Sequence, residues 1–261
     1  MPIKIEEKHV YQHVSVNNDV YLSVFKSNLA PSYAEFYTGY APNASTCKLL
    51  HTTNNITIQQ GTAEDQRVGN KVNIKSVSLV FNLHINPAQL INNFGHSELV
   101  DMKFHFRIMT VKFNTPLTAG NEDTEFADWF RETFIYYRTV SSTGGAKMPV
   151  QSNWMDKIRN SGKYTGAFKI IYDKKFSLSK FKTVKQKQII LPIKGNATFD
   201  NGTNELTDNQ ALSNIYTYLI GPSNNWLDMD AISSDKIESL STSSSALFIY
   251  NANIKTIYYD I

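Results

Sequence analysis

The sequence is almost devoid of cysteine and contains no long apolar run. Cys47 is the single cysteine among 261 residues, so no disulfide can form within the chain. A small extracellular scaffold held together by disulfides is therefore excluded. No stretch approaches about 18 consecutive apolar residues, so we predict no membrane insertion. Residues 1–8 also lack the apolar core of a secretory signal, and we expect none.

The motifs of well-known catalytic chemistries are missing as well. The chain has no Gly-X-Ser-X-Gly, no Walker A loop, no His-Glu-X-X-His and no Cys-X-X-Cys. Cys47 precedes His51 by four residues, but we interpret it as a small, partly buried thiol and not as a nucleophile. His9 and His13 lie in a strand-like segment, roughly 13 Å apart along it, too far to share a metal ion. We expect no catalytic residues, no metal site and no cofactor, and a protein that is not an enzyme.

Acidic residues are scarce in one long segment. Between Lys147 and Lys194 there are twelve Lys or Arg residues and only two acids, Asp156 and Asp173, which gives a net charge of +10. The whole chain has a net charge of only +3, so the remainder is acidic. Such an excess is typical of a surface that faces a polyanion. The alternative is a solvated face whose lysines keep the protein soluble.

Aromatic residues are plentiful, and the apolar pattern favours strands. Aromatic residues make up 12% of the chain and hydrophobic residues 41%, enough for a large β-sheet core. We predict a single domain over residues 1–261. Strand-like segments occur at residues 10–24, 71–85, 102–113, 168–172, 183–193, 215–220 and 246–261, and the last of these is either one strand or a pair of strands.

Irregularities interrupt several of these strands. The apolar parity changes between Ile74 and Val77, and again after Ile108, and each change predicts a β-bulge. Residues 17–19 predict a turn or a bulge, and residues 173–175 predict a turn.

One amphipathic helix is expected over residues 121–134, with Phe126, Trp129, Phe130 and Phe134 on one face. Residues 29–55, 196–209 and 233–245 have the composition of long loops. About eight strands, one short helix and long loops predict an all-β fold. The specific expectation is a single jelly roll of two four-stranded antiparallel sheets.

Two sequence blocks carry a family resemblance. Residues 67–72 read Arg-Val-Gly-Asn-Lys-Val and are followed by Lys75-Ser76 at the opening of a long strand. Residues 168–176 contain a Tyr-Asp-Lys block. Their order and spacing resemble those in capsid proteins of circular Rep-encoding single-stranded DNA viruses, the circovirus-like group. The resemblance covers roughly residues 10–261.

The resemblance implies a virion protein that assembles, in the host nucleus or cytoplasm, into an icosahedral T=1 shell of about sixty copies around circular single-stranded DNA. Such capsid proteins usually begin with an Arg-rich arm that binds the genome, whereas the charges of Lys4, Glu6, Glu7 and Lys8 cancel here. Either an arm is missing from this sequence or the lineage packages DNA without one. In the second case the basic segment has to neutralise the phosphates.

We therefore predict nucleic-acid contacts from the basic segment and from the Gly-rich block. The predicted residues are Lys169, Lys174, Lys175, Lys180, Lys182, Lys185, Lys187, Arg67 and Lys71. The alternation of Lys103, His105 and Arg107 predicts a second, smaller basic surface. The basic face could instead point outward and bind anionic host glycans such as heparan sulfate.

A jelly-roll lectin or carbohydrate-binding module is the alternative from another class. Trp129, Trp154 and Trp226 are candidate platforms for stacking a sugar. Trp129 is also explained by packing of the predicted helix, and a lectin does not require the segregation of charge.

Overall fold

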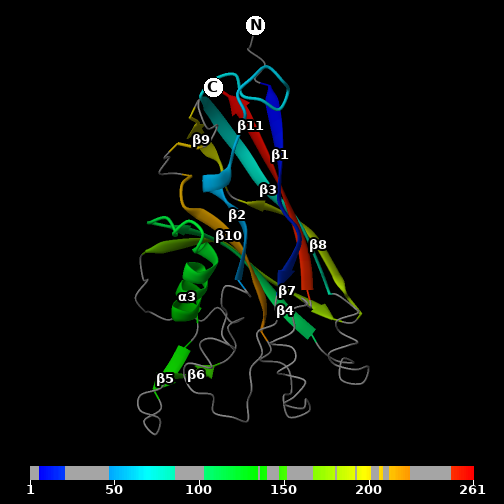
Figure 1. The fold of residues 1–261 in the computed structure, drawn as a ribbon, viewed down its shortest axis with the longest axis vertical. Helices are drawn as coiled ribbons and strands as arrows, with labels where there is room; N and C mark the ends of the chain where they lie inside the picture. The colour runs from blue at the N-terminus through cyan, green and yellow to red at the C-terminus, as the bar shows by residue number, and fades with distance from the viewer. Residues whose placement is uncertain are drawn as a thin grey trace.

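In the residues that it describes, the computed structural model shows an all-β sandwich with one α-helix (Figure 1). It describes residues 6–20, 47–85, 103–134, 136–139, 147–151, 167–179, 181–191, 193–200, 206–207, 212–223 and 248–261. The strands are β1 (Glu7–Val20), β2 (Cys47–Thr52), β3 (Lys71–Ile85), β4 (Lys103–Phe113), β5 (Tyr136–Thr139), β6 (Lys147–Gln151), β7 (Phe168–Ser179), β8 (Val184–Leu191), β9 (Gly195–Thr198), β10 (Ile215–Ser223) and β11 (Phe248–Asp260). The helices are α3 (Glu122–Phe134) and the 3-10 turn η2 (Thr53–Asn55). No helix in these ranges is long and apolar enough to cross a membrane.

The strands form two antiparallel sheets with jelly-roll connectivity. One sheet has the order β1-β11-β3-β8, with β9 paired to the start of β3, and the other has the order β2-β10-β4-β7. β5 and β6 form a separate two-stranded ribbon. The eight main strands pair as first with last, second with second-last and so on inward, as a long hairpin does when it wraps into two sheets. The predicted fold class is confirmed, with β9 as an additional strand.

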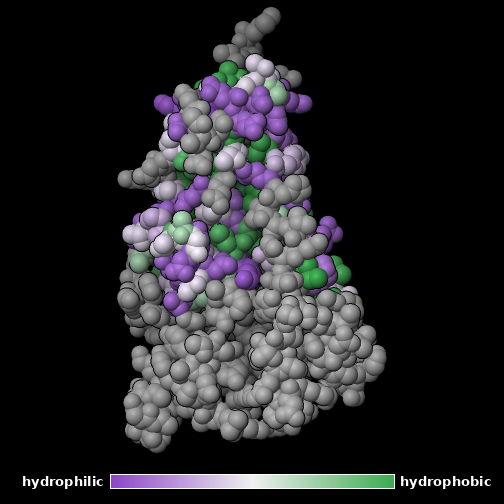
Figure 2. All heavy atoms as spheres, viewed as in Figure 1, coloured by the Kyte–Doolittle hydropathy of each residue, from purple (hydrophilic) through white to green (hydrophobic). Residues whose placement is uncertain are grey.

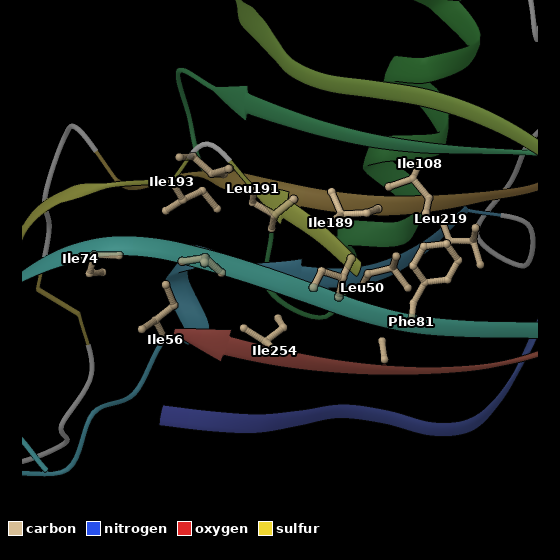
Figure 3. Close-up of a cluster of buried hydrophobic side chains, with 14 of the residues drawn as sticks. Leu50, Ile56, Ile74, Phe81, Ile108, Ile189, Leu191, Ile193, Leu219 and Ile254 are labelled. Atoms are coloured by element: carbon tan, nitrogen blue, oxygen red, sulfur yellow. The ribbon is translucent and has the colours of Figure 1, made fainter. Parts of the chain in front are cut away.

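The core lies between the two sheets. Along β3, alternate residues from Val77 to Ile85 are fully buried, which matches the period of two in the sequence. Figure 3 shows Phe81 among apolar side chains from β2, β4, β8 and β10. Phe176 of β7 packs on Phe81 of the facing sheet, with 5.6 Å between ring centroids, and on Phe106 at 5.5 Å. Aromatic contacts of this kind join the sheets.

Helix α3 covers the outer face of the second sheet (Figure 1). Phe126 stacks on Tyr218 of β10, with ring centroids 3.7 Å apart, and Trp129 meets Phe113 of β4 edge-on at 5.1 Å. Figure 1 places the helix beside β10 and β4, at a distance from the sheet that contains β1, β3 and β11. The predicted helix is therefore confirmed, and its apolar face packs on a sheet that is already buried on its other side.

The bulge predicted after Ile108 does not lie on β4. The register of β4 against β7 shifts between Thr110 and Val111, and the extra residue there is Ile171 of β7. β4 pairs with β10 without a register shift from residue 107 to residue 112. Met109 and Val111 are buried because they face the helix, whereas Phe106 and Ile108 face the other sheet. In a strand that is buried on both faces, apolar residues stand at both even and odd positions. In the sequence this looks like the change in the parity of apolar residues that a bulge causes.

The other predicted irregularities are bulges. The register of β3 against β11 shifts between Ile74 and Ser76, so Lys75 is the extra residue, as the sequence predicts. β1 shifts register twice against β11, between His13 and Ser15 and between Ser15 and Asn18, and stays one strand. Residues 17–19 therefore belong to a bulged strand and not to a turn.

Three local predictions are wrong. Residues 173–175 do not form a turn, because β7 continues through them and pairs with β4 along its whole length. β2 lies inside the predicted loop 29–55, and β9 inside the predicted loop 196–209. Both strands are short and show no clear alternation of apolar residues. They are strands because each pairs with a partner that is distant in the sequence. The predicted loop 233–245 lies outside the described residues.

We expect Phe126→Ala to lower the free energy of unfolding by about 3–5 kcal/mol, because it leaves a cavity between α3 and Tyr218. Urea unfolding followed by far-UV circular dichroism measures the change. Tyr11→Ala is the matched control, because Tyr11 is 69% exposed, and it should cost less than about 1 kcal/mol. A loss below about 1 kcal/mol for Phe126→Ala would show that the helix does not depend on this contact.

His51 makes stability depend on pH. It is buried in β2, its Nε2 has no hydrogen-bond partner among the described residues, and burial lowers its pKa from 6.5 to about 3. Below pH 6.5 the unfolded chain binds a proton at His51 that the folded chain does not bind, so stability is lost as the pH falls towards 3. The expected slope is about 1.4 kcal/mol per pH unit. Urea unfolding at pH 7 and pH 5 should show this contribution, and it should vanish in His51→Gln; an equal slope in both proteins would contradict it.

Candidate nucleic-acid interface

Two described strands of the basic segment, β7 and β8, lie at one edge of the sandwich. β7 is the last strand of one sheet and β8 the last main strand of the other. The chain passes from one sheet to the other through a tight turn, in which the backbone N–H of Ser179 donates to the carbonyl of Lys182 (3.1 Å) and that of Lys182 donates to the carbonyl of Ser179 (2.9 Å). The open sides of both strands therefore meet at the same edge.

This edge carries most of the predicted nucleic-acid-binding residues. Lys169, Lys174 and Lys175 on β7 and Lys182 in the turn are exposed, and Lys185 and Lys187 on β8 are partly exposed. Lys180 lies outside the described residues. We call the six described lysines the lysine edge. The strand pairing brings them to one side of the molecule, where the sequence had shown only that they are near one another in the chain.

The lysines of β8 point towards the gap between the sheets. Lys185 and Lys187 pair with Leu83 and Phe81 of β3, so they share the inner face with two buried core residues. The Lys187 Nζ lies 3.5 Å from the Tyr172 hydroxyl of β7, in the opposite sheet. Their aliphatic stems cover the core at its open edge, and their ammonium groups reach solvent.

These lysines also protect the strand edges. The outer sides of β7 and β8 pair with no other strand in the part of the chain that the structure describes. Exposed edges of this kind invite pairing with another chain, and lysines or inward-pointing charges are common means of preventing it. The lysine edge is therefore suited to a partner held by charge and not by added β-structure.

Asp173 is the only acidic residue of strands β7 and β8, and its charge is neutralised by a buried arginine. The Arg107 guanidinium donates from Nε and Nη2 to the two carboxylate oxygens of Asp173, each at 2.7 Å. Arg107 is fully buried, and its guanidinium lies over the ring of Phe134 at 4.5 Å. A cavity of about 340 Å³ opens beside this pair, lined by Arg107, Phe134, Ile170, Ile171, Tyr172, Asp173 and Lys174. Asp173 therefore subtracts little from the positive potential of the edge.

One member of the predicted basic row of β4, Arg107, does not lie at the surface. Arg107 lies beneath the end of α3 and is committed to Asp173, so it is not available to a ligand. The side chains of Lys103 and His105 lie outside the described part of the structure. The sequence pattern failed here because a helix covers the face that alternation marked as outward.

Arg67 has a structural position and not one at the surface. It is fully buried, and its guanidinium donates to the carbonyls of Ile58 (3.0 Å), Gly69 and Asp200 (3.1 Å) and to Asn70 Oδ1 (3.1 Å). It also lies over the ring of Phe199, at 5.5 Å. These bonds tie the loop between β2 and β3 to the loop after β9. The burial of Arg67 argues against its prediction as a phosphate ligand.

Lys71 is exposed but distant from the lysine edge. It pairs with Thr198 at the start of β3, whereas Lys187 pairs with Phe81, ten residues further along that strand. Ten residues of a strand span roughly 33 Å. Lys75, the other lysine of the Gly-rich block, is bonded to Glu7. The Gly-rich block at residues 67–76 therefore lies towards the opposite end of β3 from Lys185 and Lys187.

One neighbouring basic residue was missed in the sequence. Lys112 of β4 pairs with Lys169 of β7 and lies on the same face of the sheet. It lies 35 residues before the basic segment begins, so a count of charge along the sequence could not include it. Only the pairing of β4 with β7 brings the two lysines together.

No cluster of three or more His, Cys, Asp or Glu side chains suited to a metal ion occurs among the described residues. The described residues show a jelly-roll sandwich with a lysine-rich edge. No protein-family model matches the chain, and no curated protein matches its sequence.

We expect Arg67→Lys to lower the free energy of unfolding by at least about 3 kcal/mol. An ammonium group cannot reach all four oxygens that the guanidinium contacts, so buried acceptors lose their donors. Urea unfolding measures the loss, and Lys71→Ala, at an exposed position, should stay within about 0.5 kcal/mol. If Arg67→Lys keeps full stability and weakens nucleic-acid binding instead, the structural role is refuted.

Proposed function

We propose that this protein is a viral capsid protein whose jelly roll assembles into a small icosahedral shell around circular single-stranded DNA. The observation that carries the proposal is the lysine edge, in which six lysines from two sheets line one side of a jelly roll. The jelly roll is an architecture that viral capsid and lectin domains share. The resemblance of residues 67–76 and 168–176 to circovirus-like capsid proteins supports the first of these classes.

The lysine edge suits a sequence-independent ligand. Lysine ammonium groups on strands offer point charges to phosphates without the fixed geometry that reads a base. Among the described residues, Lys169, Lys174, Lys182 and Lys185 form no ion pair with an acid. Their charge is available to a polyanion, and packaging requires binding of this kind, which tolerates any sequence.

A lectin has less support in the structure. Trp129 is only 2% exposed and packs against Phe113, Phe126 and Phe168, so it offers no platform to a sugar. Trp154 and Trp226 lie outside the described residues. The proposed capsid function explains the concentration of lysine on one edge, which a sugar-binding site does not need.

Assembly is tested directly by sedimentation velocity and negative-stain electron microscopy of the full-length protein purified from a heterologous host. The proposal predicts closed particles of uniform size, about 20 nm across, with closed symmetry limiting growth. A monomer that stays monomeric across salt and protein concentrations, and that a glycan column retains, would refute the capsid function and favour the lectin.

The lysine edge is tested by Lys182→Ser, Lys185→Ser and Lys187→Ser combined. We expect intact particles with a lower ratio of nucleic acid to protein, measured by absorbance at 260 and 280 nm on purified particles. The matched control removes three lysines elsewhere, Lys48, Lys71 and Lys255, each replaced by serine. Equal nucleic-acid content in both triple variants would show that net charge, and not this edge, holds the nucleic acid.

A further inference from the structure

The turn that joins β7 to β8 presents an aromatic ring to solvent. Phe181 is 86% exposed, more than any other large hydrophobic side chain among the described residues. The other described aromatic residues of the basic segment, Phe168, Tyr172 and Phe176, are partly buried and pack against the two cores. Among the described rings of the basic segment, Phe181 is therefore the one that the fold leaves exposed to solvent.

The ring is held at a defined place. The two backbone hydrogen bonds between Ser179 and Lys182 close the turn that contains Phe181. The next residue, Thr183, accepts a hydrogen bond from the backbone N–H of Ile85 (2.9 Å), which anchors the start of β8 to the end of β3. A side chain on a closed and anchored turn loses less conformational freedom on binding than one on an open loop.

The surroundings of the ring are positively charged. Lys182 is exposed directly after Phe181, and Lys185 follows on β8. The acid of this edge, Asp173, is bonded to Arg107. Figure 2 shows hydrophobic and hydrophilic surface side by side over the end of β7 and the start of β8. An exposed aromatic face next to lysines combines the two elements that bind single-stranded nucleic acid, base stacking and phosphate neutralisation.

We propose that Phe181 stacks on an unpaired base of single-stranded nucleic acid while Lys182 and Lys185 neutralise adjacent phosphates. This inference rests on the proposed function. It gives the lysine edge a preference for single-stranded over double-stranded nucleic acid, which lysines alone cannot supply. In a duplex the faces of the bases are stacked on one another, so only the phosphates are accessible to the edge. The ring therefore selects single strands, and it does so without regard to sequence, because every base has a stacking face.

The experiment compares a 20-nucleotide oligothymidylate with a 20-base-pair duplex by fluorescence anisotropy, using the full-length protein. Sedimentation in the same buffer reports the assembly state of each variant. Phe181→Ala should weaken binding of the oligothymidylate roughly 5- to 150-fold and leave duplex binding unchanged. The slope of log affinity against log salt should stay the same, because no phosphate contact is lost.

Three matched variants separate stacking from charge and from general hydrophobicity. Phe181→Trp should retain the affinity for oligothymidylate. Val184→Ala, which shortens another exposed apolar side chain at 55% exposure, should change neither affinity. Lys182→Ser should weaken both probes and reduce the salt slope by about 0.7 for the single strand, the value expected for one phosphate contact.

Several outcomes would overturn the inference. Phe181→Ala could bind oligothymidylate as tightly as the wild type, or it could lose both probes equally. If Phe181→Ala leaves nucleic-acid affinity intact and abolishes assembly, Phe181 is a contact between copies of the protein. If it leaves nucleic-acid affinity intact and abolishes flotation with phosphatidylserine vesicles, Phe181 is a membrane contact. A wild-type protein that binds neither probe would instead refute nucleic-acid binding itself, and the inference with it.

Discussion

The passage of the chain from one sheet to the other between Ser179 and Val184 is the constraint on which the rest of the structure depends. Because this turn is tight, β7 and β8 must lie at the same edge of the sandwich, each as the last main strand of its sheet. A longer connection would allow the two strands to lie apart. The lysines of β7, β8 and the turn then lie along one edge, and Phe181 in the turn is 86% exposed beside them.

The same lysines serve the fold and the proposed ligand. Lys185 and Lys187 close the open side of the core with their stems, and they prevent two exposed strand edges from pairing with other chains. Neutralisation of Asp173 by the buried Arg107 leaves the edge strongly positive. Figure 2 shows hydrophilic surface gathered at the end of the sandwich near the C-terminus, where Lys8 pairs with Asp260.

Prediction from sequence succeeded where the spacing of apolar residues within a segment determines which of its side chains are buried. The alternation along β3 and the helical spacing of Phe126, Trp129 and Phe130 gave the correct elements and, through their number and order, the jelly roll. It failed where burial depends on a distant partner. Met109 and Val111 seemed to mark a bulge because no local signal shows that a helix covers that face. Arg67 has the residue type of a phosphate ligand, but one of its acceptors, on Asp200, lies 133 residues away. The exposure of Phe181 likewise depends on how two sheets meet and not on the residues beside it.

The central claim is that the lysine edge holds the nucleic acid inside an assembled particle. Ultraviolet crosslinking of purified particles, followed by nuclease and protease digestion and mass spectrometry, identifies the residues that touch the bases and sugars. The account predicts that nucleotide adducts concentrate on peptides from residues 168–187, with Phe181 among the modified positions. Adducts confined to peptides outside this range, or particles that contain nucleic acid but give no adduct on β7, β8 or their turn, would contradict it.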